Sequence, residues 1–108
     1  MTPLDVVNKR MHAYNQHQLD DFLATYAEDV SIFTYPDTLL GKGKDHLNML
    51  FAEMFAEGAV EVVIHQQIVK DSYVINHETV SYNGQETEYV SIYEVRDGHI
   101  QSVRFVRD

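Results

Sequence analysis

The sequence has no cysteine, only two prolines and fewer than half as many basic as acidic residues. Without cysteine there can be no disulfide bond, no thiolate nucleophile and no zinc or iron–sulfur site held by cysteine. The 8 Lys and Arg residues stand against 17 Asp and Glu, which gives a formal net charge of −9. Nucleic-acid binders need clustered basic residues, and none are clustered here, so we expect no nucleic-acid partner.

Long hydrophobic runs are missing as well. The longest apolar runs are far shorter than the roughly 20 residues that span a bilayer. The segment Met1–Asp5 has no basic region followed by an apolar run, as a signal peptide would have. The negative charge also disfavours anionic membranes. We therefore expect a soluble, cytoplasmic protein without a membrane partner.

The sequence does contain enough apolar material for one core. Its 108 residues are 44% hydrophobic and include five Phe and seven Tyr. This length fits one domain and argues against two. No repeat, linker or low-complexity tract divides the chain, so we expect a single domain over residues 1–108.

The first half of the chain predicts three helices and one strand. Thr2, Pro3 and Asp5 form a helix start, and apolar residues at helical spacing then continue to about Asn15. The same spacing returns in residues 19–26 and, most clearly, in Leu47–Phe55. Between the last two, the β-branched and aromatic segment Val30–Tyr35 predicts a strand, and a turn with two glycines follows it.

The second half predicts an antiparallel meander, because the apolar period changes to two. Asn83-Gly84 and Asp97-Gly98 are strong two-residue hairpin turns. With a turn at Asp71-Ser72, they separate four strands: Val60–Val69, Tyr73–Tyr82, Glu86–Val95 and His99–Val106.

Three helices can cover only one face of such a sheet. If the sheet curls around the long helix, it encloses a space between sheet and helices. The other face also carries apolar side chains, as Tyr73 and Ile75 show by their alternation with Val74 and Asn76. We therefore expect a homodimer that forms through the outer face of the sheet.

Five segments resemble the nuclear transport factor 2-like superfamily, in particular its SnoaL-like and ketosteroid isomerase-like domains. They are Ala13–Asn15, Leu19–Leu23, Tyr26–Val30, Gly41–Gly43 and Ile92–Ile100. The resemblance implies an α+β fold, a cystatin-like roll. In it a cone-shaped, curved antiparallel sheet, made of the four-strand meander and a short first strand, wraps around three N-terminal helices. It does not imply an activity, because the superfamily holds isomerases, cyclases, dehydratases and non-catalytic binding modules.

The resemblance to ketosteroid isomerases breaks down at the catalytic base. These enzymes use a pocket carboxylate as base, with a tyrosine and a protonated aspartate as hydrogen-bond donors. Here the position of the base holds Thr34, and the donor positions fall near Arg10 and at Tyr93 or Ser91. Threonine cannot take a carbon-bound proton near neutral pH, so we do not expect steroid isomerisation.

Strand alternation predicts which side chains line the enclosed space. If Tyr93 points inward, so do Ser91 on its own strand, Asn76 and Glu78 on the preceding strand, and Phe105 on the last. A buried Glu78 could act as a general acid or base. Alternatively, it lies at a wet rim or pairs with Arg104 or a lysine. Asn76 and Tyr93 could bind a ligand oxygen or be satisfied polar groups of the core.

Three further residues are candidates for ligand contact. Tyr14 and Tyr35 could bring phenol groups to the pocket mouth, although Tyr14 also fits core packing. Thr34 could donate to a ligand or be an ordinary strand residue. His65 and His77 could approach each other across neighbouring strands, but no third ligand is evident. We expect neither a metal nor a cofactor.

Two functions remain open. In one, the protein is a non-catalytic pocket protein that binds a small, apolar, oxygen-bearing molecule. In the other, it is a cofactor-independent isomerase, cyclase or dehydratase that uses Glu78 as acid or base. A buried Glu78 beside empty volume favours the enzyme, whereas a Glu78 tied to arginine favours the binding or a purely structural role.

Overall fold

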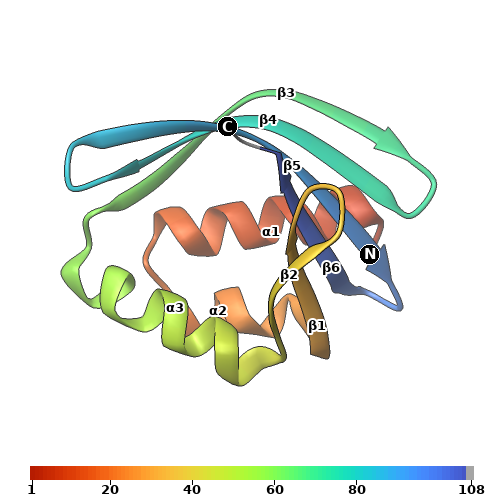
Figure 1. Ribbon diagram of the computed structural model, residues 1–108, viewed down its shortest axis with the longest axis horizontal. Coiled ribbons are helices and arrows are strands. Elements are labelled where there is room, and N and C mark those ends of the chain that lie inside the picture. The colour runs from red at the N-terminus through yellow and green to blue at the C-terminus, as the bar shows by residue number, and fades with distance from the viewer. Residues whose placement is uncertain (107–108) are drawn as a thin grey trace.

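The computed structural model describes residues 1–106, and in them the predicted α+β roll is confirmed. Figure 1 shows three helices on one side of a curved sheet. The elements are α1 (Pro3–Asn15), α2 (Leu19–Ala24), β1 (Tyr26–Thr34), β2 (Thr38–Lys42), α3 (Lys44–Glu57), β3 (Val60–Lys70), β4 (Tyr73–Tyr82), β5 (Gln85–Arg96) and β6 (His99–Val106).

The helix ends follow local chemistry. At the start of α1 the Thr2 hydroxyl accepts a hydrogen bond from the Asp5 amide at 3.2 Å, and the Asp5 carboxylate accepts one from the Thr2 amide at 3.1 Å. This capping box satisfies two amides that the helix leaves free. Helix α3 ends at Gly58, whose φ of 65° is left-handed and suits glycine.

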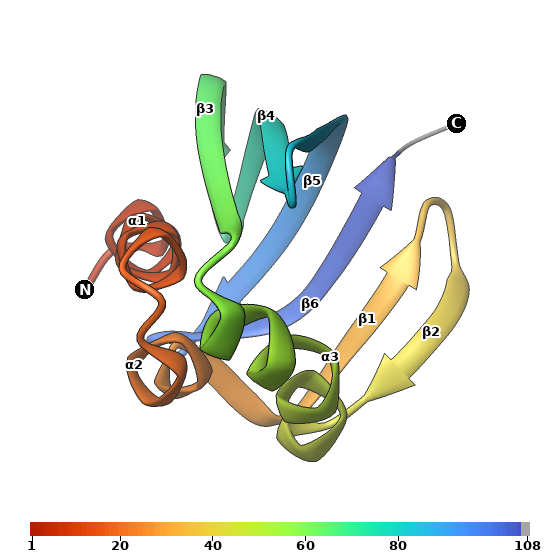
Figure 2. The same ribbon diagram turned by 90° about the vertical axis from the view of Figure 1, so that its left-hand side faces the viewer.

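The sheet has the order β2-β1-β6-β5-β4-β3 (Figure 2). The meander β3–β6 is antiparallel as predicted, and both residues of the Asn83-Gly84 and Asp97-Gly98 turns have positive φ. Strand β6 then lies parallel to β1, with Val103 opposite Ile32. The sheet is therefore mixed, because its last strand returns to the side of its first.

Strand β2 was not predicted. The segment Thr38–Lys42 reads as a turn because it is short, contains Gly41 and is followed by Gly43, but it pairs antiparallel with the free edge of β1. A second difference is that β1 begins at Tyr26 rather than Val30. The second helix ends at Ala24, where the Thr25 hydroxyl donates to the Phe22 carbonyl at 2.7 Å.

Five aromatic rings join the helices to the sheet. Phe22 lies at their centre, fully buried, with ring centroids of Tyr14, Tyr26, Phe51 and Phe55 between 4.9 and 6.0 Å away. These rings come from all three helices and from β1. Edge-to-face and tilted contacts of this kind add to the free energy gained by burial.

The convex face of the sheet is not covered by any helix (Figures 1 and 2). In register across β3, β4 and β5 it presents Ile68, Ile75 and Ile92. Ile68 is 60% exposed and the neighbouring Tyr73 is 42% exposed. The same face brings the His65 and His77 rings to 5.1 Å between centroids. None of the helices within residues 1–106 is both long and apolar enough to cross a membrane.

The central position of Phe22 makes it the residue whose loss the fold tolerates least. Phe22→Ala is expected to lower the free energy of unfolding by about 3–5 kcal/mol, because it removes a fully buried ring. Urea denaturation measures this. Met49→Ala on the exposed side of α3 is the control and should change it by no more than about 0.5 kcal/mol. Equal effects of the two changes would contradict the described core.

Candidate functional site

The concave side of the sheet and the helices enclose a cavity of about 520 Å³. Its lining comes from residues spread along the chain between positions 10 and 105. The residues are Arg10 and Tyr14 of α1, Thr34 of β1, Leu40 of β2, Leu50, Phe51 and Met54 of α3, Glu78, Val80 and Tyr82 of β4, Gln85, Thr87, Tyr89 and Ser91 of β5, and Phe105 of β6.

The cavity has a buried polar end and an exposed, largely apolar mouth. Arg10, Glu78 and Ser91 are each at most 4% exposed and mark the inner end. Toward solvent the lining includes Leu40 and Leu50, which are about half exposed. A pocket that is apolar along its walls and polar at one end orients an amphipathic molecule.

Arg10 is buried because it lies on the apolar face of α1. Its Nε donates to the Tyr26 hydroxyl at 2.9 Å, and its Nη1 donates to the Met11 sulfur at 3.3 Å. Three rings surround the guanidinium carbon, with centroids at 5.0 Å for Tyr14, 4.9 Å for Phe22 and 5.6 Å for Tyr93. Cation–π attraction and the phenol acceptor thus compensate part of its lost hydration.

Arg10 stays charged in this position. Burial by itself lowers the pKa of Arg10, but the Tyr26 and Tyr93 phenols and the Glu78 carboxyl outweigh it, so that the pKa lies above its ordinary value. For the acidic phenol of Tyr93 burial acts in the opposite direction and raises the pKa well above its ordinary value, although the Arg10 charge opposes this rise. Arg10 at the inner end of the cavity is therefore a permanent cation that packs against the neutral phenol of Tyr93.

Glu78 projects inward from β4, as strand alternation predicts, and lines the cavity at 2% exposure. Its Oε1 is buried and has no hydrogen-bond partner among the described residues. No lysine or arginine nitrogen within residues 1–106 comes within 4.0 Å of its carboxylate. Both alternatives for Glu78, a wet rim and a pair with Arg104 or a lysine, are therefore wrong.

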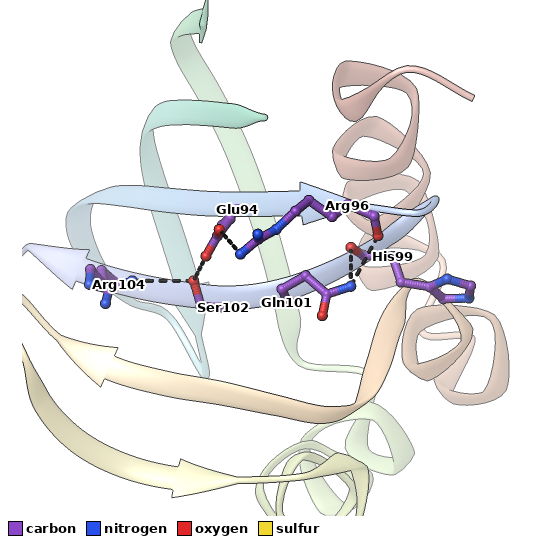
Figure 3. Close-up of polar contacts among 6 residues, drawn as sticks. All are labelled: Glu94, Arg96, His99, Gln101, Ser102 and Arg104. Atoms are coloured by element: carbon purple, nitrogen blue, oxygen red, sulfur yellow. Dashed lines mark hydrogen bonds and ion pairs between the residues drawn. The ribbon is translucent and has the colours of Figure 1, made fainter. Parts of the chain in front are cut away.

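Arg104, one of the expected partners of Glu78, is on the other face of the sheet. Figure 3 shows it beside Ser102, which in turn contacts Glu94. Arg104 also reaches Asp37 at 3.4 Å and lies over the Phe33 ring at 4.4 Å. This network fixes Arg104 on the outer surface and leaves Glu78 to the cavity.

Three other predicted residues form a buried polar column beside Glu78. Ser91 lines the cavity, and Asn76 lies opposite it in register on β4. Asn76 and Tyr93 are fully buried but do not line the cavity. The Asn76 amide and the hydroxyls of Ser91 and Tyr93 have no hydrogen-bond partner in the described part of the chain.

Of the remaining predicted residues, three line the cavity and one does not. Tyr14, Thr34 and Phe105 line the cavity, and Tyr14 also packs in the aromatic core. Tyr35 does not line it and is 57% exposed, so its assignment to the pocket mouth is wrong. The physical reason is that β1 ends at Thr34, and the chain turns away through Pro36 toward β2.

The residue that sequence analysis undervalued is Arg10. It falls on the stripe formed by Val7, Met11 and Tyr14, at the spacing of one helix face. A charged residue on an apolar stripe was the available signal, because burial of arginine needs partners. The cavity wall from α3 belongs to the predicted apolar stripe Leu47–Phe55, whereas Leu40 of β2 had no such signal.

A family model described as the SnoaL-like domain matches residues 7–103. The chain belongs to this family. The predicted resemblance is thereby confirmed for almost the whole chain. No curated protein matches the sequence.

Solved structures show the same fold as this SnoaL-like domain at low sequence identity. An NTF2-like protein of unknown function from Cytophaga hutchinsonii has a TM-score of 0.85 and 19% identity, over 100% of this chain and 91% of that one. A cystatin-fold protein from Novosphingobium aromaticivorans has a TM-score of 0.86 and 20% sequence identity, over 99% of both chains. A computationally designed 17-OHP binder has a TM-score of 0.85 and 18% sequence identity, over 100% of this chain and 92% of that one.

Two tyrosines test the polar end of the site. Tyr93→Phe should leave the free energy of unfolding unchanged or slightly raised, because the hydroxyl it removes is buried without a partner. Tyr26→Phe should lower it by about 1–3 kcal/mol, because the Arg10 Nε would lose its acceptor. Urea denaturation of both variants measures the difference. A larger loss for Tyr93→Phe than for Tyr26→Phe would contradict this description.

Proposed function

We propose that this SnoaL-like domain binds a small molecule with an apolar body and an oxygen-bearing end. The observation that carries the proposal is the 520 Å³ cavity with apolar walls and a buried polar end at Arg10, Glu78 and Ser91. Its volume lies within the range of about 300–1,000 Å³ typical of ligand pockets. The designed 17-OHP binder supports it, because that protein holds a small molecule with the same fold.

The walls and the inner end have separate parts in this binding. Phe51, Met54 and Phe105 would bury the apolar body, and each Å² of apolar surface removed from water contributes about 25 cal/mol. The Arg10 guanidinium and the Ser91 hydroxyl would donate to the ligand oxygen. Binding to these donors loses little conformational entropy, because the fold already holds their side chains in place.

Catalysis by Glu78 is the second candidate function. It is favoured by one observation: the carboxylate is buried beside the cavity, and its Oε1 has no partner within residues 1–106. A carboxylate in this position could take a proton from a bound substrate and return it elsewhere, which is the chemistry of a cofactor-independent isomerase, cyclase or dehydratase. Thr34, at the base position of ketosteroid isomerases, could exchange a hydrogen bond with a substrate but could not take a carbon-bound proton.

The binding proposal predicts thermal stabilisation by its ligand. Steroids, aromatic polyketides, terpenoids and small hydroxy-ketones are to be screened at fixed protein concentration by thermal shift. A ligand at a hundred times its Kd adds about 2.7 kcal/mol, which corresponds to a rise in Tm on the order of 10 °C for a domain of this size. If no compound of these classes raises Tm, the cavity does not serve as a ligand pocket.

Glu78→Gln separates the two functions once a ligand is known. If Glu78 is the acid or base, the change should lower turnover at least about a hundredfold while Kd changes little. Glu86→Gln removes the same charge from an exposed position on β5 and should leave turnover unchanged. Steady-state kinetics and calorimetry give the two numbers. Undiminished turnover by the Glu78 variant would contradict a catalytic role.

We further propose a homodimer through the convex face of the sheet. Its support is the uncovered row of Ile68, Ile75 and Ile92 on that face. Glu94, two residues after Ile92 on β5, forms a hydrogen-bonded chain with Arg96 and Ser102 (Figure 3). Apolar centres with polar surroundings are typical of protein–protein interfaces.

The dimer proposal is tested by charge at the centre of the row. Ile75→Lys should raise the dimer Kd by at least about a hundredfold, because it would bury an unpaired ammonium group. Analytical ultracentrifugation measures the association. Met49→Lys on α3, which is 76% exposed, is the control and should leave it unchanged. A monomeric wild-type protein at all concentrations would contradict the proposal.

A further inference from the structure

Two opposite charges line the cavity without touching each other. Arg10 and Glu78 are the two charged side chains that are buried within residues 1–106, and both line the same cavity. No nitrogen–oxygen distance between them is 4.0 Å or less. The Nε of Arg10 donates a hydrogen bond to the Tyr26 hydroxyl, and its Nη1 donates one to the Met11 sulfur. The Oε1 of Glu78 has no hydrogen-bond partner among the described residues. The cavity therefore offers an unused donor group and an unused acceptor.

Buried charges that are not paired are costly, so a ligand that meets both gains most. Its polar end must accept a hydrogen bond from Arg10 and donate one to Glu78. We propose that the cavity selects a neutral ligand whose acceptor lies beside a donor, as in a hydroxy-ketone or a primary carboxamide. This inference rests on the proposed binding function and names the polarity of its ligand.

The same arrangement disfavours charged ligands. A carboxylate would pair with Arg10 but would bring a second negative charge to Glu78. An ammonium group would pair with Glu78 but would be repelled by Arg10. A neutral ligand with an acceptor alone would leave Glu78 Oε1 without a partner. Because Arg10 and Glu78 are buried, these interactions are screened less than they would be at the surface, which makes the discrimination steep.

Four probes with one naphthalene body test the polarity of the site. They are 2-naphthamide (donor and acceptor), 2-acetylnaphthalene (acceptor only), 2-naphthoate (anion) and 2-naphthylmethylammonium (cation), and calorimetry at pH 7 gives their Kd values. The amide should bind about tenfold tighter than the ketone and tighter still than both ions. Equal affinities, or tightest binding of an ion, would overturn the inference and leave the pocket standing. Failure of all four to bind would contradict the binding function itself.

Variants then assign the preference to Glu78. In Glu78→Gln the ratio of the naphthoate Kd to the naphthamide Kd should fall at least about tenfold, because the repulsion of the anion is gone. Glu86→Gln, which removes an exposed carboxylate outside the cavity, should leave that ratio unchanged. Circular dichroism checks that both variants fold. An unchanged ratio in folded Glu78→Gln would overturn the inference.

Discussion

The guanidinium of Arg10 sits inside a ring of aromatic side chains, and the interior is arranged around it. Taking such a cation out of water costs several kcal/mol even after relaxation. The Tyr26 hydroxyl, the faces of Tyr14, Phe22 and Tyr93, and the field of Glu78 offset that cost. These partners come from α1, α2, β1, β4 and β5, so the placement of one charge ties the helices to both halves of the sheet. Partial compensation also explains why the site can accept another polar group.

The cavity follows from the way the sheet closes. The chain enters the sheet with β1 and leaves it with β6, and these two strands pair in parallel between β2 and β5. The long strands β3, β4 and β5 then extend to one side and the short β2 to the other. Helix α3 lies across the concave side (Figure 2). Residues of β2 and β4 that are far apart in the sequence therefore share one cavity lining. Curvature thus creates a space that neither helices nor strands fill.

Sequence patterns predicted the local structure and the side-chain direction on the meander. They did not predict the contacts between side chains of different elements or the pairing of the edge strand. Alternation with a period of two placed Glu78, Ser91 and Phe105 inward, because hairpin turns fixed the register. The cage of Arg10 could not be predicted, since its members meet only in the folded chain. Tyr35 was misplaced because a strand pattern does not say where pairing stops. Strand β2 was not predicted because the formation of a short edge strand depends more on pairing with its neighbour than on the β-propensity of its own residues.

Arg10 and Glu78 face one open cavity without contacting each other. A high-resolution crystal structure of the ligand-free protein tests this arrangement most directly. We expect the two side chains to lie apart, with ordered water or a solute bridging the guanidinium and the Glu78 carboxylate. A direct ion pair between Arg10 and Glu78, with side chains filling the space between helices and sheet, would contradict it.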